Sequence, residues 1–416
     1  MLISVLLPIA LTVVGVIMLV KLRFFFVLHP ISTFRNFFRE MKSKKVRRSF
    51  FLALAGTLGV GNIFGVAAGL IIGGPGTLFW LLISSFFSMI IKYSETIMVF
   101  ELADEGQGMW AVLSKVYKNS GKYMATVYSL LTIALALLMG AALQSSALID
   151  TVNESSSKAG VFVTIILVLL VLPCILVGSG KIDKITEIII PMTTMIYISM
   201  CFFTILGNHT RIPNVISNII FSAFSLKSCL GGVTILAIKE GFARGVLSNE
   251  AGVGTSALAH SSARERSPHV AGIFAMLEVF FDTTILCMMT GFAILLSVDD
   301  ISSYKTPMSL VNAAFVGSLG EFAQPILTFC ILSFAYATII CWYFYGDRAT
   351  LSLSPKSRSV FAWLFLAAIA FSGIIRYDFL LSATDVILFL MSIMTLSTII
   401  KKRGLIILAS KNGMQK

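Results

Sequence analysis

Apolar segments of membrane-spanning length follow one another along almost the whole of this 416-residue chain. A helix needs ~20 mainly apolar residues to cross the hydrocarbon core of a bilayer. Hydrophobic residues make up 57% of the sequence and charged residues only 12%, far from the composition of a soluble domain. Since the gaps are too short for a separate soluble domain, we expect an all-α polytopic membrane protein. The eleven expected spans are residues 2–20, 49–72, 76–100, 123–149, 160–178, 186–207, 229–247, 269–297, 322–345, 359–375 and 378–400.

Basic residues are unevenly divided between the connections of these spans. Of the 32 Lys and Arg residues, 25 lie in alternate connections and five lie in the others. The positive-inside rule therefore predicts a protein of the cell membrane with its N-terminus outside and its C-terminus in the cytoplasm. The net charge of +12 reflects this orientation and contact with anionic membrane lipids, so we expect no nucleic acid partner. The expected cytoplasmic segments are 21–48, 101–122, 179–185, 244–268, 347–358 and 401–416.

The segment from Lys21 to Arg48 combines six phenylalanines with nine basic residues. This composition favours an amphipathic helix on the cytoplasmic membrane surface, with a plain connecting loop as the alternative. Segment 2–20 lacks the basic start and the cleavage site of a signal peptide, so we expect a retained span. The six cysteines form no CxxC pair and are expected to be buried free thiols, and the histidine spacing gives no support to a metalloenzyme.

One expected span is interrupted by glycines at its centre. Residues 56–65 read Gly-Thr-Leu-Gly-Val-Gly-Asn-Ile-Phe-Gly. Glycine costs helix stability and lets the backbone leave the helical region. A break in the bilayer interior frees N–H and C=O groups, which is tolerated only where they face protein, water or a bound solute. We therefore expect a binding site at this break.

Charged side chains inside apolar spans need a partner or a function. Lys92 and Glu95 lie toward the cytoplasmic half of the third span, and Lys239 and Glu240 near the inner end of the seventh. Ion pairs made by these residues would join helices at the inner surface. Asp282, in the eighth span, has no basic neighbour in sequence, so a structural and a functional role both stay open.

A second polar segment, residues 241–254, closes the seventh span and contains four glycines. By itself it predicts a structured inner loop, with glycines that permit a tight turn at the membrane edge. Asn249 and Glu250 would either cap helix ends or form an inner gate with Arg244.

These motifs, in this order, resemble those of the alanine/glycine:cation symporters over about residues 47–400. The matching motifs are residues 56–65, 73–80, 92–95, 241–254, 281–283 and 341–347. The resemblance implies the leucine-transporter (LeuT) fold, in which two inverted five-helix repeats follow one extra N-terminal helix. The implied domains are 1–48 for the N-terminal helix and amphipathic segment, 49–207 for the first repeat, 208–228 for an extracellular connection, 229–400 for the second repeat and 401–416 for the basic tail.

The resemblance also implies Na⁺-coupled symport of a small neutral amino acid of the alanine or glycine class, without an organic cofactor. N–H groups at the break would hold the substrate carboxylate, and freed carbonyls would face Na⁺. The implied substrate-binding residues are Thr57, Gly59, Val60, Gly61, Asn62, Gln144, Cys229, Gly231 and Gly232, the last two at a second helix break. The implied Na⁺ ligands are Ala55, Leu58 and Thr338. The residues expected to act in gating and coupling are Lys92, Glu95, Lys239, Glu240, Arg244, Asn249, Glu250 and Asp282.

The chain departs from the family pattern at the expected pocket. Val60 and Ala337 stand where members usually carry hydroxyl residues, Ser146 stands in place of Asn, and Cys229 replaces an aromatic lid residue. Backbone-mediated binding survives such replacements, so an amino acid substrate is still expected. The accepted side chain could be larger than that of alanine, and coupling to H⁺ in place of Na⁺ stays open.

Other functional classes fit this sequence less well. A non-transporting amino acid sensor would gain support from tight binding without flux, but the cytoplasmic connections are short for a signalling protein. An enzyme would need a nucleophile–base or metal constellation, and the sequence offers none. A channel is disfavoured because the glycine breaks recur in a transporter-like order. We therefore expect a transporter and not an enzyme.

Overall fold

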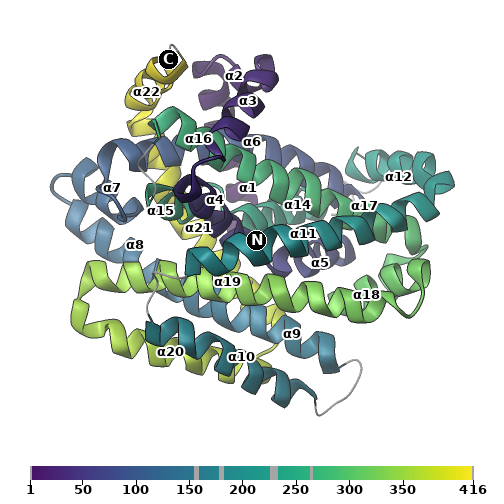
Figure 1. Ribbon diagram of the computed structural model, residues 1–416. Helices are drawn as coiled ribbons and strands as arrows, with labels where there is room; N and C mark the ends of the chain where they lie inside the picture. Colours follow the sequence, from purple (N-terminus) through teal and green to yellow (C-terminus); the bar gives the residue numbers. More distant parts are fainter. Residues whose placement is uncertain (1, 154–158, 178–181, 225–232, 263–265, 415–416) are drawn as a thin grey trace.

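The computed structural model describes residues 2–153, 159–177, 182–224, 233–262 and 266–414. Within these ranges the chain is built from helices, with no β-strand. Figure 1 shows long helices side by side, with α7 (Met109–Val116) at one end of the bundle and α12 (Ile212–Phe224) and α18 (Pro307–Leu319) at the other. The expected all-α architecture is confirmed.

Six of the described helices are long and apolar enough to cross a membrane, and one bent pair adds a seventh candidate span. The six are α6 (Gly76–Leu102), the continuous helix Gly121–Val152, α11 (Ile182–Gly207), the continuous helix Pro268–Ser297, α19 (Ala323–Leu353) and α21 (Tyr377–Lys401). The bent pair joins Lys44–Thr57 to Val60–Gly73 at 58°. The shorter apolar helices α1 (Leu2–Lys21) and α10 (Ala159–Val177) coincide with two further expected spans. The full count of eleven stays a prediction.

Large apolar side chains face outward from several of these helices. Leu169 on α10, Ile188 on α11 and Trp363 on α20 (Arg358–Ala370) are 61%, 68% and 71% exposed. An outward apolar surface on long helices is typical of contact with lipid. The chain is therefore a multi-pass membrane protein.

Two of the long helices contain a π-helical segment, which is rare and often marks a functional site. η2 (Ala136–Leu143) joins α8 (Gly121–Leu135) to α9 (Gln144–Asn153). η5 (Phe280–Cys287) joins α16 (Pro268–Val279) to α17 (Met288–Ser297). Gln144 directly follows η2 and Asp282 lies within η5, so both irregular turns carry or adjoin an expected site residue.

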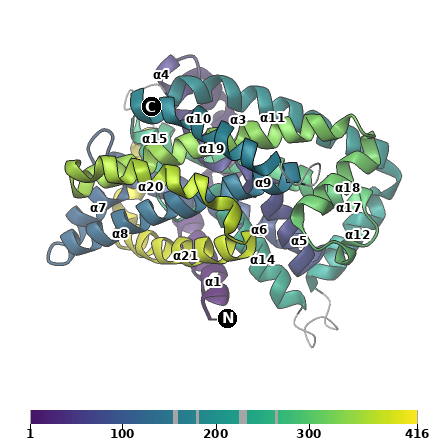
Figure 2. The same ribbon diagram turned by 90° about the horizontal axis from the view of Figure 1, so that it is seen from below.

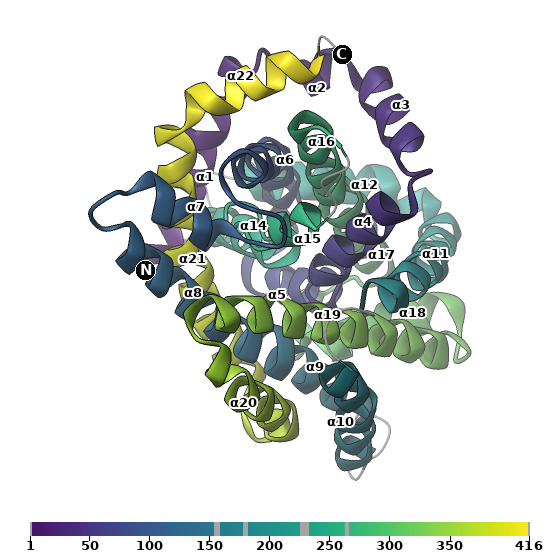
Figure 3. The ribbon, with the colours of Figure 1, turned by 60° about the vertical axis from the view of Figure 1, so that its left-hand side comes forward.

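The centre of the bundle is formed by α6, which contacts α14 (Val233–Asn249) and α16. Figure 3 shows these three helices in the middle, with α19, α9 and α20 along one side. α1 lies against α6 and α21 (Figure 2). Small residues permit this close approach, because a Cβ added to Gly245 would lie 2.6 Å from the Ser84 hydroxyl on α6.

Short helices cover the two ends of the bundle. The end predicted to be cytoplasmic carries α2 (Phe25–Leu28), α3 (Pro30–Glu40) and α22 (Arg403–Met414). A helix in segment 21–48, in place of a plain loop, is therefore confirmed. The other end carries η4 (His209–Arg211) and η6 (Ile301–Ser303), and η7 (Pro355–Ser357) and η8 (Ser372–Ile374) flank α20. The described cysteines are buried and free, as expected, namely Cys174, Cys201, Cys287, Cys330 and Cys341.

Candidate functional site

The expected helix break is present at the centre of the second span. α4 (Lys44–Thr57) ends at Thr57, and Leu58 and Gly59 leave the helical region, Gly59 with an extended backbone at φ −122° and ψ −160°. A single turn, η1 (Val60–Asn62), leads into α5 (Phe64–Gly73). Every residue from Ala53 to Leu70 is buried, so the freed backbone groups face protein and not lipid.

Side chains occupy the N–H groups that the break frees. The Gly59 N–H donates to Asn62 Oδ1 at 3.1 Å, and the Val60 N–H donates to Gln144 Oε1 at 3.0 Å. Gln144 is therefore brought to the break as expected, with its amide oxygen at the position where a carboxylate oxygen would accept the same bond. The Thr57 hydroxyl donates back to a carbonyl of its own helix at 3.2 Å.

Gly59 and Gly61 differ in the space around them. A Cβ on Gly59 would lie 2.8 Å from Thr338 Oγ1 and 2.9 Å from Gln144 Oε1. A Cβ on Gly61 would meet its nearest atoms at 3.8 Å, on Leu247. Of these two glycines, only Gly59 therefore has neighbouring side chains so close that they leave no room for a larger residue.

The expected Na⁺ ligands include two oxygens that lie side by side. The Thr338 hydroxyl on α19 donates to the Leu58 carbonyl at 3.3 Å. The Gly59 N–H, which in a continuous helix would donate to the Ala55 carbonyl, donates to Thr57 O and Asn62 Oδ1 instead. The oxygen atoms of a hydroxyl and of freed carbonyls are ligands that suit a hard cation. The chemistry of these oxygens therefore suits Na⁺.

A further interruption, called the second break below and distinct from the one expected at Gly231 and Gly232, lies after α14. This helix ends at Asn249, and six residues separate it from α15 (Ser256–Ser261). Between them Glu250, Gly252 and Gly254 adopt positive φ angles of 56°, 79° and 84°. A left-handed conformation is uncommon for a residue with a side chain and occurs often at functional sites.

The second break is level with the first, because Asn62 Nδ2 donates to Ser248 Oγ at 3.0 Å. Segment 241–254 therefore ends α14 in a glycine-containing turn, as its sequence suggested, and this turn is buried. Its Glu250 carboxylate is fully buried and accepts a hydrogen bond from the Thr255 hydroxyl. The expected pocket residues Cys229, Gly231 and Gly232 lie outside the described residues.

Asp282 joins the two breaks. Its Oδ1 accepts from Asn62 Nδ2 at 2.5 Å, and its Oδ2 accepts from the hydroxyls of Ser248 at 2.6 Å and Thr283 at 2.7 Å. The amide of Asn249 donates in turn to Thr283 Oγ1 at 3.0 Å. A buried carboxylate needs such donors, and here they come from the first break, the end of α14 and η5 itself. Asp282 thus fixes the relative position of both interruptions.

A buried ion pair lies below the breaks, toward the end predicted to be cytoplasmic. Lys92 Nζ lies 3.0 Å from Glu278 Oε1, and both side chains are fully buried. The expected ion pair that joins helices is therefore present for Lys92, between α6 and α16. Glu95 forms no ion pair with Lys92. Its Oε2 instead accepts the Gly252 N–H at 3.0 Å and so fastens the second break to α6.

Three residues that the sequence did not single out extend this ion pair. His260 Nε2 lies 3.0 Å from Glu278 Oε2, and Arg266 donates to His260 Nδ1 at 2.9 Å. Arg266 also donates to Ser49 Oγ on α4 at 3.2 Å. Burial lowers the pKa of His260 to about 4, so the ring is neutral, with its proton on Nε2. The charged residues at the end of segment 256–266 were the available signal in the sequence, but they did not indicate which residues would form hydrogen bonds or ion pairs.

Arg244 lies on the other side of the breaks. It donates to Glu240 at 3.1 Å and to Asp385 on α21 at 2.6 Å, and Lys239 lies 3.2 Å from Glu240 as expected. Its side chain faces α5, since a Cβ on Gly69 would lie 2.9 Å from Arg244 Cγ. The expected inner gate of Arg244 with the end of α14 is therefore wrong, because Arg244 is more than a helical turn back along α14.

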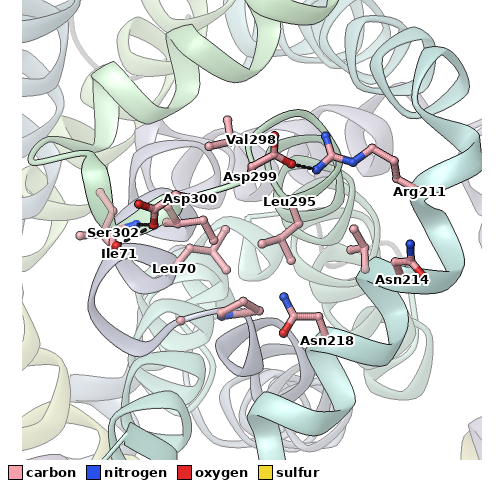
Figure 4. Close-up of a pocket in the computed structure, with 14 residues that line it drawn as sticks. Leu70, Ile71, Arg211, Asn214, Asn218, Leu295, Val298, Asp299, Asp300 and Ser302 are labelled. Atoms are coloured by element: carbon pink, nitrogen blue, oxygen red, sulfur yellow. Dashed lines mark hydrogen bonds and ion pairs between the residues drawn. The ribbon is translucent and has the colours of Figure 1, made fainter.

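Two surface cavities lie near α5. Figure 4 shows one of about 460 Å³ at its far end, where Arg211 and Asp299 form an ion pair beside Asn218. The other, of about 380 Å³, is lined by Phe64, the first residue of α5, together with Tyr377 and Asp150. This second cavity therefore lies at the start of α5, which follows the first break.

Comparison with known proteins identifies the family. The model of the sodium:alanine symporter family matches residues 1–412. An uncharacterized transporter of Haemophilus influenzae is 30% identical over 88% of this chain and 82% of its own length. The sodium/alanine symporter AgcS of Methanococcus maripaludis is 28% identical over 72% of this chain and 69% of its own. The fold is similar to that of MhsT, crystallised with L-phenylalanine, with a TM-score of 0.57 at 14% identity over 84% of this chain and 87% of that one, a LeuT-like neighbour. The chain therefore belongs to the sodium:alanine symporter family and is a transporter, not an enzyme.

Proposed function

We propose that this protein moves a small neutral amino acid of the alanine or glycine class into the cell together with Na⁺, by alternating access. The observation that carries the proposal is the pair of helix breaks at one level, held together by Asp282 through Asn62 and Ser248. Paired breaks offer backbone N–H groups to an anion and carbonyls to a cation at mid-membrane depth. The family match and the sodium/alanine symporter AgcS among the relatives support sodium and an amino acid as the cargo.

The substrate carboxylate would bind where Gln144 now accepts the Val60 N–H. Gln144 would swing aside when the substrate arrives and return when it leaves, which keeps the N–H group satisfied in both states. Because the contact uses the backbone, the valine at position 60 does not remove it. Na⁺ would lie at the carbonyls of Ala55 and Leu58 and the hydroxyl of Thr338, next to the carboxylate that it helps to bind.

The proposed gates lie on opposite sides of the breaks. Arg244 with Asp385 would close the outer path, and the ion pair of Lys92 with Glu278 would close the inner path. This assignment uses the predicted orientation, with the N-terminus outside and the C-terminus in the cytoplasm, but places Arg244 within α14 in place of the expected cytoplasmic segment 244–268. It also uses the predicted architecture of one helix followed by two inverted five-helix repeats.

Uptake of labelled alanine and glycine into proteoliposomes tests the proposal. We expect uptake that depends on an inward Na⁺ gradient and that stops when choline replaces Na⁺. Gly59→Leu should abolish it, while Gly207→Leu, at a site with no atom within 4 Å of the added Cβ, should leave it unchanged. Equal uptake in choline would reject sodium coupling. Tight binding without flux would instead support an amino acid sensor.

A further inference from the structure

A cavity of about 300 Å³ lies apart from the transport site, where the end of α1 meets α2 and α22. Figures 1 and 3 show α22 beside α2 at the end of the bundle that is predicted to be cytoplasmic. The wall of this cavity has a basic part and an apolar part. The proposed transport cycle does not use this space.

Three cations from three different elements form the basic part of the wall. Lys21 lies in the last turn of α1, Arg23 in the corner before α2 and Lys411 in the last turn of α22. Within the described residues none of the three has a carboxylate partner, and no described residue in the wall carries a carboxylate. Like charges around one space repel each other, and a bound anion removes this repulsion. The basic part of the wall is therefore complementary to an anion.

The backbone corner between α1 and α2 allows the three elements to share one cavity. Arg23 and Phe24 both adopt left-handed φ angles, of 56° and 51°, and the Phe24 N–H donates to the Leu19 carbonyl at 3.0 Å. Two consecutive residues with side chains in this conformation cost free energy and persist only where the surrounding structure holds them. The corner thus places Arg23 in the same wall as Lys411, although the two residues belong to opposite ends of the chain.

The apolar part of the wall lies at the edge of the membrane. Lys21 is the first charged residue of the chain and directly follows the apolar length of α1, so it marks the end of the hydrocarbon region. Leu22, Phe25 and Ile407 line the cavity next to the cations. Leu28 lines it too and is 65% exposed. An inorganic anion makes no use of such a surface, whereas a phospholipid carries apolar chains beside its charged headgroup.

We propose that this cavity is a binding site for an anionic phospholipid. The phosphate would lie among Lys21, Arg23 and Lys411, and the acyl chains would lie against the apolar part of the wall. Basic pockets between helices on the cytoplasmic side of membrane proteins bind headgroups of this kind. The two parts of the ligand match the two parts of the wall, and the site is separate from those proposed for the substrate and Na⁺.

Both sides of the cavity are connected to Tyr93 on α6. The ring of Phe25 lies 4.8 Å from the ring of Tyr93, centre to centre, and the Tyr93 hydroxyl donates to Ser410 Oγ on α22 at 2.7 Å. Tyr93 directly follows Lys92, which forms the buried ion pair with Glu278. A bound lipid would therefore hold α2 and α22 against α6 and stabilise the closed inner side. This effect on transport rests on the proposed function, whereas the binding site does not.

Thermal unfolding of the purified full chain tests the site. In nanodiscs, we expect phosphatidylglycerol added to phosphatidylcholine to raise the unfolding temperature, because a ligand of the folded state stabilises it. In detergent, inorganic phosphate is compared with chloride at equal Na⁺ concentration and ionic strength, and we expect no difference. Stabilisation by phosphate would overturn a lipid as the ligand, and no effect of phosphatidylglycerol would overturn the site. Stabilisation by phosphatidylglycerol without amino acid uptake would reject the proposed function and leave this site in place.

Charge-matched variants separate this site from general attraction to an anionic surface. The double variant Lys21→Gln and Lys411→Gln should lower the apparent affinity for short-chain phosphatidylglycerol, titrated in detergent, by about 30-fold. The control, Lys118→Gln with Lys122→Gln, removes the same charge from exposed positions outside this cavity and should leave the affinity unchanged. His29→Arg adds a cation to the wall and should tighten binding about fivefold, a gain that misfolding cannot produce. Equal affinities in the cavity variants and the control would overturn the proposal.

Discussion

Gly59→Ala should damage this protein far more than Gly61→Ala, although the two glycines are two residues apart in one motif. The Gly59 backbone is extended, so an alanine there meets no strain in φ. The damage comes from contact, because the new Cβ would lie 2.8 Å from Thr338 Oγ1 and 2.9 Å from Gln144 Oε1. Overpacking of a well-filled interior costs about 1–3 kcal/mol. If Gln144 moves away, the buried Val60 N–H loses its acceptor, which adds about 1–3 kcal/mol.

The expected loss for Gly59→Ala is therefore about 2–6 kcal/mol in the free energy of unfolding, with loss of Na⁺-dependent uptake. Gly61→Ala meets only ordinary contacts at 3.8 Å and should be neutral, or stabilising by about 0.4–1 kcal/mol through the unfolded state. Thermal unfolding of both variants in detergent, with uptake in proteoliposomes, measures the difference. Equal stability of the two variants would refute the reasoning, because it would mean that Thr338 and Gln144 do not define the space at Gly59.

Three further perturbations test the polar contacts. Asp282→Asn replaces a charged acceptor with a neutral amide that cannot serve all three donors, so unfolding free energy should fall by about 1.5–3 kcal/mol, measured by chemical unfolding. Glu278→Gln leaves Lys92 buried without its ion pair and should cost about 3–5 kcal/mol, whereas Lys239→Gln, at a partly exposed pair, should cost under about 1 kcal/mol. Burial lowers the pKa of His260 from 6.5 to about 4. The contribution of the neutral ring to the free energy of unfolding is therefore complete above pH 6.5 and is lost as the pH falls toward 4, by up to about 3 kcal/mol. A His260→Gln variant should lose that part of the pH dependence in thermal unfolding between pH 7 and pH 5.

The first break was predictable because its cause is local. Glycines in an apolar run change backbone energetics wherever they occur, and residues 56–65 carry four of them. Gln144 and Thr338 came from family resemblance, and the structure brings both to that break. Asn62 was expected to touch substrate, which stays a prediction, and in the structure it bridges Gly59 and Asp282.

The second break was predicted only as a structured loop that closes a span, because its signal resembles that of a loop. Polar residues around glycines normally end a membrane span, and only tertiary contacts reveal that segment 241–254 stays buried. The sequence also did not show which residues would pair with the buried charged side chains. Ion pairs that join helices were expected at Lys92 and Glu95, but only the packing of α6 against α16 and the second break decides that Lys92 meets Glu278 and Glu95 meets Gly252.

The polar contacts divide into two sets, and this division bears on how the proposed cycle could run. On one side of the breaks Arg244 ties α14 to α21, and on the other Lys92, Glu278, His260 and Arg266 tie α6, α15, α16 and α4 together. Asp282 lies between the sets and holds Asn62 and Ser248, which belong to the two broken helices. In the proposed cycle, opening either path would require only one set to separate, while Asp282 would keep the breaks aligned. A carboxylate with neutral donors suits that role, because it orders both helices without an opposite charge that would bind it to one gate.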